Sequence, residues 1–185
     1  MSSRERFSLT VREIQEGDIQ GILSYWLDSD SDHLKSMGVD LEKIPPLEQL
    51  QMRLRTQLKQ SYKEKVSYCT IWEIDGEAVG HCNVSDILYG KTASMHLHMW
   101  ANENRGKGCG LKLVAMSLPW FFNNLELEYL ICEPYALNPA PNKTIERLGF
   151  EFVKEYETIP GSLNFMQPVK QWRLSRDKFK ETFGN

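Results

Sequence analysis

The stretch that decides the fold is Ala93-Ser-Met-His-Leu-His-Met-Trp-Ala-Asn-Glu-Asn-Arg-Gly-Lys-Gly-Cys-Gly-Leu111. Residues 93–100 alternate with period two, which is typical of a β-strand. One face would carry three apolar side chains and the other three rings: Met95, Leu97 and Met99 against His96, His98 and Trp100. Glycines at alternate positions follow, and from Leu111 the apolar spacing becomes helical. The stretch therefore predicts a strand, a glycine-rich loop and the start of a helix.

The glycine loop has a chemical use at this junction. The first turn of a helix has unpaired N–H groups and a partial positive charge, and glycines let an anion approach them closely. The glycines alone are equally consistent with an anion-binding loop and with a tight surface turn. Arg105 and Lys107 add a cationic rim that a turn does not need, and they favour a phosphate or pyrophosphate site.

Two common phosphate loops do not match. A P-loop requires Lys-Ser or Lys-Thr after its glycines, and neither is present. A dinucleotide fingerprint requires a third glycine where Leu111 stands, and it normally follows the first strand of a parallel sheet. The remaining pattern, Arg105, Gly108 and Gly110 after a strand, resembles the acyl-CoA pyrophosphate loop of the GCN5-related N-acetyltransferase (GNAT) superfamily.

Bulk properties indicate an ordinary globular protein. At 185 residues the chain suits one domain, residues 1–185, and a formal net charge of −3 argues against a nucleic-acid surface. No run approaches the ~18 apolar residues of a membrane span, and the charged start is unlike a secretory signal, so we expect a cytoplasmic protein without a membrane partner. The four cysteines lack a Cys-x-x-Cys pair and are expected to be reduced, with Cys109 the one accessible to thiol reagents.

The remaining chain predicts further strands and helices. Strands are expected at residues 7–14, 66–74, 78–84, 129–132, 152–158 and 171–174. Asp75-Gly76 indicates a hairpin, so an antiparallel meander precedes the glycine loop. Helices are expected after Asp18 as the cap, from Leu47 to about Ser61, and from Gly110 to about Asn123 with a kink or early end at Pro119. Asp28–Asp32 with His33 looks like a solvated loop rather than a cation site.

A second motif agrees with the same superfamily. Asn138 stands before a short helix that closes with Leu148-Gly149-Phe150, as in GNAT proteins, although this ending alone is a common helix stop. The chain is thus identified as similar to GNAT enzymes, closest in look to the ribosomal-protein N-terminal acetyltransferase (RimJ/RimL-like) branch. The resemblance implies an α+β fold with a mostly antiparallel, twisted sheet of about seven strands, splayed between the fourth and fifth and flanked by helices.

The resemblance also implies the cofactor and its contacts. Acetyl-CoA would be the donor, with no metal, and the acceptor would be a primary amine on a protein N-terminus or a small molecule. Asn138 would bond the cofactor from one side. The other cofactor-binding residues would be the pantetheine contacts Trp100, Ala101 and Asn102 and the pyrophosphate loop Arg105, Gly106, Lys107, Gly108, Cys109 and Gly110.

The attacking amine needs a base, and the resemblance ranks Glu133 first. His96 and His98 are rivals because imidazole titrates near neutral pH, and either is as readily a hydrogen-bonded cleft residue. The positions where relatives carry a tyrosine or serine acid hold Ile145 and Pro141, which leaves Tyr135 as the nearest donor for the leaving thiolate.

Two loops would contact the acceptor and determine its identity. One spans Trp26 to His33 and the other Gly161 to Pro168, and we take Trp26, His33 and His98 as candidate substrate residues. Two alternatives stay open within the family: a siderophore-type hydroxylysine-amine acetyltransferase, and a catalytically silent acyl-CoA-binding regulatory module. A dinucleotide-binding oxidoreductase is disfavoured by the antiparallel meander. The assembly is expected to be a monomer or a homodimer.

Overall fold

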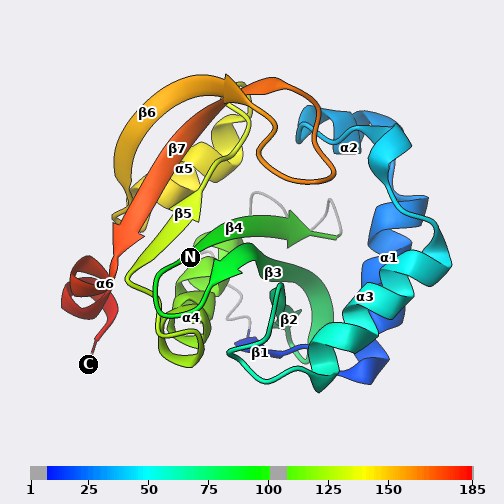
Figure 1. The fold of residues 1–185 in the computed structure, drawn as a ribbon, viewed down its shortest axis with the longest axis horizontal. Helices are drawn as coiled ribbons and strands as arrows, with labels where there is room; N and C mark the ends of the chain where they lie inside the picture. Colours follow the sequence, from blue (N-terminus) through cyan, green and yellow to red (C-terminus); the bar gives the residue numbers. More distant parts are fainter. Residues whose placement is uncertain (1–7, 101–107, 185) are drawn as a thin grey trace, which may run out of the picture.

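A computed structural model of the chain describes residues 8–100 and 108–184. Within these residues, seven strands form one sheet in the order β1-β2-β3-β4-β5-β7-β6 (Figure 1). The strands are β1 Leu9–Glu13, β2 Tyr68–Ile74, β3 Glu77–Leu88, β4 Thr92–Met99, β5 Tyr129–Cys132, β6 Glu151–Thr158 and β7 Gln167–Ser175. Neighbouring strands are antiparallel except for the parallel pair β4 and β5. This confirms the predicted fold.

Six α-helices flank the sheet in the described part of the chain. They are α1 Ile19–Asp28, α2 Ser31–Ser36, α3 Leu47–Lys59, α4 Cys109–Asn124, α5 Pro139–Arg147 and α6 Arg176–Phe183, with short 3₁₀ turns η1 Glu16–Asp18 and η2 Leu41–Lys43. Among these residues, no helix combines the length and apolar character needed to cross a bilayer.

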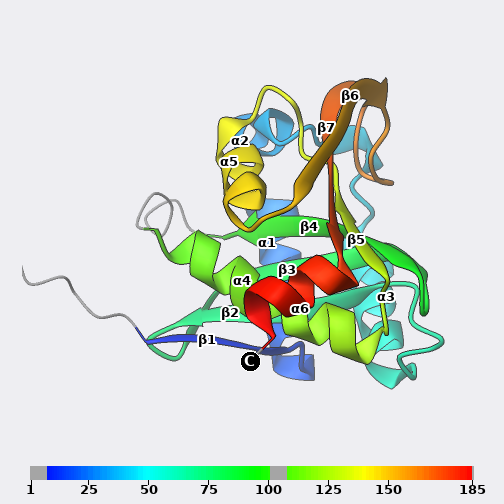
Figure 2. The ribbon, with the colours of Figure 1, turned by 90° about the vertical axis from the view of Figure 1, so that its left-hand side faces the viewer.

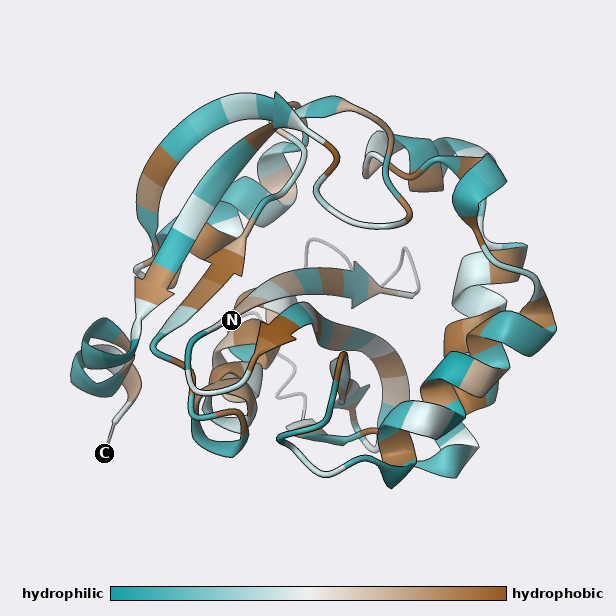
Figure 3. Ribbon diagram, in the orientation of Figure 1, coloured by the Kyte–Doolittle hydropathy of each residue, from teal (hydrophilic) through white to brown (hydrophobic). Residues whose placement is uncertain are grey.

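The helices cover the two faces of the sheet (Figures 1 and 2). On one face, α4 buries Leu113, Leu118 and Phe121 against strand residues such as Met95. On the other face, α1 and α3 lie side by side and pack with the β2 residues Cys69 and Ile71 (Figure 1). Most of β5 is apolar (Figure 3). This composition suits a strand with a neighbour on each side, and Leu130 and Cys132 are buried.

Local turn chemistry accounts for the connections. Asp75 and Gly76 have φ of 52° and 84°, so both central residues of the β2–β3 hairpin are left-handed, as a tight turn of this kind requires. Gly149, with φ of 82°, ends α5 before β6. Both turns confirm the sequence-based predictions.

Three local predictions need correction. α4 ends at Asn124, close to the expected end at about Asn123, but the early end considered at Pro119 is wrong. The following Phe121 and Phe122 are fully buried, and their packing outweighs the lost backbone bond. The segment expected to be a solvated loop contains the start of α2, whose N-cap Asp30 accepts a hydrogen bond from the His33 N–H at 2.9 Å.

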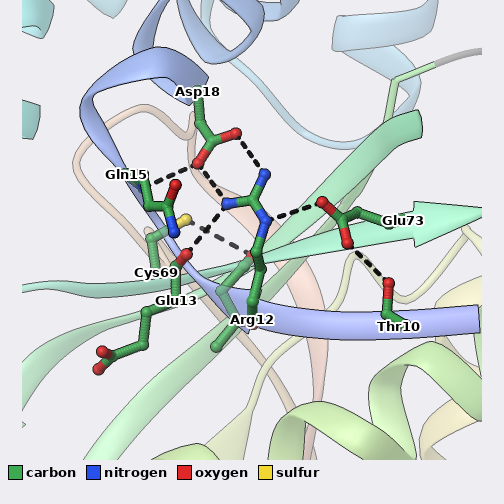
Figure 4. Close-up of polar contacts among 8 residues, drawn as sticks. Thr10, Arg12, Glu13, Gln15, Asp18, Cys69 and Glu73 are labelled. Carbon is green, nitrogen blue, oxygen red and sulfur yellow. Dashed lines mark hydrogen bonds and ion pairs between the residues drawn. The ribbon is translucent and has the colours of Figure 1, made fainter. Parts of the chain in front are cut away.

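The third correction concerns Asp18, which makes no side-chain cap bond to α1. Its carboxylate is held instead by Arg12 of β1, whose terminal nitrogens donate at 2.6 and 2.8 Å, and by the Gln15 N–H at 2.7 Å (Figure 4). Arg12 Nε also donates to Glu73 of β2 at 2.7 Å. These bonds, above all that to Asp18, raise the pKa of Arg12. Arg12 therefore ties β1, β2 and the turn before α1 together.

Candidate active site

The strands β4 and β5 part at one end of their pairing. Their register runs from Thr92↔Tyr129 to Met95↔Cys132, whereas β4 continues to Met99. The gap expected between the strand ending near Trp100 and the strand ending at Cys132 is therefore present. It leaves the last half of β4 paired with β3 alone within the described chain.

Backbone directions along β4 follow from its pairing with β3. The Trp100 N–H donates to the Val79 carbonyl at 2.9 Å, so it points away from the gap. Successive residues of a strand point their N–H and C=O groups to opposite sides. Leu97, three residues earlier, therefore turns its backbone groups toward the gap, on the same side as the Met95 carbonyl, which accepts from Cys132 Sγ at 3.3 Å.

A cavity of about 280 Å³ opens at this gap. It is lined by all three catalytic candidates, Glu133, His96 and Tyr135, and by the expected cofactor contact Asn138. The loop residues from Gly161 to Asn164 also line it, as do the substrate candidates Trp26 and His98. His33 lies instead in a separate hollow with Asp28, Asp30 and Trp100.

Glu133 directly follows β5 and is held by two donors. Tyr156 Oη of β6 and Gln171 Nε2 of β7 donate to its Oε1 at 2.5 and 2.6 Å. None of the described residues hydrogen-bonds its other oxygen, Oε2. Burial, together with the bond to Glu133, raises the pKa of Tyr156 to about 12, so this phenol stays a donor at neutral pH. The arrangement fixes one carboxylate oxygen and leaves the other for a proton.

Burial favours the neutral form of the histidines of β3 and β4. Burial lowers the pKa of His96, against opposing effects of Asp86 and Glu133, and Nε2 of His96 lies 2.9 Å from Ser85 Oγ. His98 stacks on His81 of β3 with ring centroids 4.5 Å apart, and burial lowers the pKa values of both. Neutral imidazole is the form that can accept a proton, so His96 has the state that a rival base needs.

One residue that organises the site was not identified from sequence. Asn142, on α5, donates to the carbonyls of Tyr135 and Asn138 at 3.0 and 2.8 Å and accepts from Trp172 Nε1 at 2.9 Å. It thereby holds the turn that carries Tyr135 and Asn138 against β7. In the sequence, Asn142 is visible only as a second asparagine four residues after Asn138, and this does not identify its partners.

The cofactor loop is described only from Gly108 onward; Ala101, Asn102, Arg105, Gly106 and Lys107 lie outside the described residues. Gly108 has a left-handed φ of 78°, and nothing lies within 4 Å of a Cβ built on it or on Gly110. The start of α4 therefore offers open backbone there. Cys109 is only 5% exposed, so the expectation of a reagent-accessible thiol is wrong, because α4 turns this side chain into the core.

Solved structures of known proteins share this fold. Spermidine N-acetyltransferase from Vibrio cholerae, solved with CoA and spermine, has a TM-score of 0.74 at 18% identity, covering 92% of this chain and 97% of that one. The aminoglycoside acetyltransferase AAC(6')-Ib, solved with coenzyme A, has a TM-score of 0.73 at 20% identity, covering 95% and 99%. RimL, a ribosomal α-N-protein acetyltransferase solved with CoA, has 0.74 at 11% identity, covering 92% and 96%.

Sequence comparison gives the family directly. A search of the curated proteins returned no significant match. The profile described as "Acetyltransferase (GNAT) domain" matches residues 8–151, which is more than half of the chain and includes the parted strands, the start of α4 and Glu133. The chain therefore belongs to the GNAT acetyltransferase family.

Proposed function

We propose that residues 1–185 form a single acetyltransferase domain that transfers the acetyl group of acetyl-CoA to a primary amine by direct attack in a ternary complex. One observation carries the proposal: a carboxylate fixed through one oxygen borders a cavity at the point where β4 and β5 part. The CoA-bound structures that share the fold support acetyl-CoA as the donor.

The described residues fit this donor. Leu97 directs its backbone groups into the gap, where a pantetheine arm would pair with them and the N–H would polarise the thioester carbonyl. The open backbone at Gly108 and Gly110 begins α4, where the partial charge of a helix N-terminus suits a diphosphate. When bound there, acetyl-CoA supplies an activated acyl group.

The protein's own groups handle the protons. Glu133 takes a proton from the ammonium group, directly or through water, before the neutral amine attacks. The N–C bond then forms, the C–S bond breaks, and the acetylated nitrogen releases its second proton to solvent. The departing thiolate gains a proton from Tyr135, which lines the same cavity, or from water. Ile145 and Pro141 cannot donate a proton. This lack favours the silent acyl-CoA-binding module as the second candidate function.

Two measurements test the proposal. Calorimetric titration should detect acetyl-CoA binding, and thiol release should follow when primary amines are added. Absence of binding at millimolar acetyl-CoA would refute both candidate functions. Tight binding without thiol release across a broad panel of amines would contradict the enzyme and support the silent module.

A further inference from the structure

The charged groups that line the cavity are few. Among the described lining residues, Glu133 is the one carboxylate and Arg53 the one lysine or arginine. Glu133 directly follows β5, whereas Arg53 lies on α3, which forms a different wall of the cavity. The cavity therefore offers a negative and a positive group on two separate elements.

Arg53 lies on the cavity face of α3. Leu50, Leu54 and Gln57 line the same cavity, and with Arg53 they form the i, i+3, i+4, i+7 pattern of one helix face. Arg55, two residues on, points elsewhere and donates to Glu16 at 2.7 Å. Among residues 8–100 and 108–184, none forms an ion pair or hydrogen bond with Arg53. Arg53 is an exposed residue that lines this cavity, so among the described residues its cation is available to a ligand there.

The wall around Arg53 is mainly apolar. Besides Leu50 and Leu54, it includes side chains from α1 and the segment after α2: Ile22, Trp26, Met37 and Val39. These side chains can cover an apolar body of a ligand, and the few polar groups would then fix its orientation. An acceptor with several positive charges would instead bring like charge against Arg53, and the described lining residues include no second carboxylate to receive it.

We propose, resting on the proposed function, that the acceptor is a primary amine that carries a carboxylate beyond an apolar spacer. Arg53 pairs with the carboxylate while Glu133 receives the amine. Guanidinium and carboxylate groups form the strongest class of protein hydrogen bonds, so this pairing selects anionic acceptors over neutral amines and polyamines. Spermine, the compound bound in the Vibrio cholerae enzyme, differs from such an acceptor because it is a polyamine with positive charges only.

The test uses three probes that share one carbon chain: ε-aminocaproate, n-hexylamine and hexamethylenediamine. Calorimetry in the presence of CoA should show ε-aminocaproate binding about tenfold more tightly than hexylamine, and hexamethylenediamine binding most weakly. In Arg53→Gln the ratio of ε-aminocaproate to hexylamine affinity should fall toward one. Arg53→Glu should invert the order in favour of the diamine. Arg55→Gln, on the same helix but outside the cavity, should keep the wild-type ratio.

Equal binding of the three probes, a preference for the diamine, or an unchanged ratio in Arg53→Gln would overturn the inference. These readouts do not require turnover. They are therefore separable from failure of the proposed function, which would appear as loss of acetyl-CoA binding or of thiol release with every amine.

Discussion

At the scale of single residues, the site depends on how Glu133 is held. Tyr156 and Gln171 both donate to Oε1, so the orientation of the carboxylate is set before any acceptor arrives. Such support from outside the reacting groups keeps a base within reach of its proton. Arg12 stabilises the fold in a similar way, because its ion pair with the buried Asp18 neutralises that carboxylate between β1 and α1.

The first prediction concerns the base. Glu133→Gln keeps an oxygen that can accept from Tyr156 and Gln171, but it cannot take a proton at neutral pH. We expect kcat to fall about hundredfold, while the acetyl-CoA dissociation constant measured by calorimetry changes less than about twofold. Glu128→Gln, an exposed position just before β5, is the matched control and should leave kcat unchanged. An unaltered rate in Glu133→Gln would assign the role to His96.

At the scale of elements, the end of β4 depends on its contact with β3. Gly80 of β3 is the register partner of Met99, and a Cβ built on Gly80 lies 2.5 Å from the His98 carbonyl oxygen and 3.3 Å from the Met99 Cα. Two backbones thus approach where only glycine fits. Because β5 has already diverged, this close pairing is what positions the strand edge that borders the cavity.

The second prediction follows from this contact. Gly80→Ala forces β3 and β4 apart, and it should lower the free energy of unfolding in urea by about 2 kcal/mol and also reduce kcat/KM. Gly17→Ala is the control, since nothing lies within 4 Å of a Cβ there. It should change the unfolding free energy by less than about 0.5 kcal/mol. Equal stability of the two variants would contradict the steric argument.

At the scale of the whole molecule, a ring cluster joins the sheet to α1. His81 is 3% exposed, stacks on His98 and accepts a hydrogen bond from Trp100 Nε1 at 2.7 Å. Tyr25 of α1 makes T-shaped ring contacts with both histidines. Burial, with a smaller effect of His96, lowers the pKa of His81 to about 3, so the cluster requires a neutral ring.

The third prediction is a loss of stability in acid. The folded-state pKa of His81 lies below its ordinary value of 6.5, so the unfolded chain takes up the proton first as the pH falls. The contribution of neutral His81 to the free energy of unfolding is therefore fully present above pH 6.5 and is lost as the pH falls toward 3. At about pH 5 the loss from His81 alone should be about 2 kcal/mol relative to neutral pH.

Urea unfolding at a series of pH values measures this loss. His81→Asn keeps an acceptor for Trp100 Nε1 but does not titrate, so its unfolding free energy should fall less steeply between neutral pH and about pH 5. The comparison uses the slope, because the variant's absolute stability also reflects lost ring stacking. Parallel slopes for the two proteins would exclude His81 as the source.

The sequence by itself determined the local structure and the family. Period-two alternation, the Asp75-Gly76 turn and the Asn138 to Gly149 motif predicted the strands, the meander and α5, because such patterns depend on neighbours a few residues apart. The helical start at Ser31 was missed because polar and acidic residues cap a helix as readily as they line a loop.

Only the tertiary structure decided which side chains meet. The partners of Glu133 lie 23 and 38 residues away, and they reach it because the sheet order β5-β7-β6 brings their strands alongside. Because of the same packing, Arg53 lies on the cavity face of α3 and His33 lies in a separate hollow. Side-chain convergence of this kind depends on long-range register and helix docking, for which periodicity along the chain carries no information.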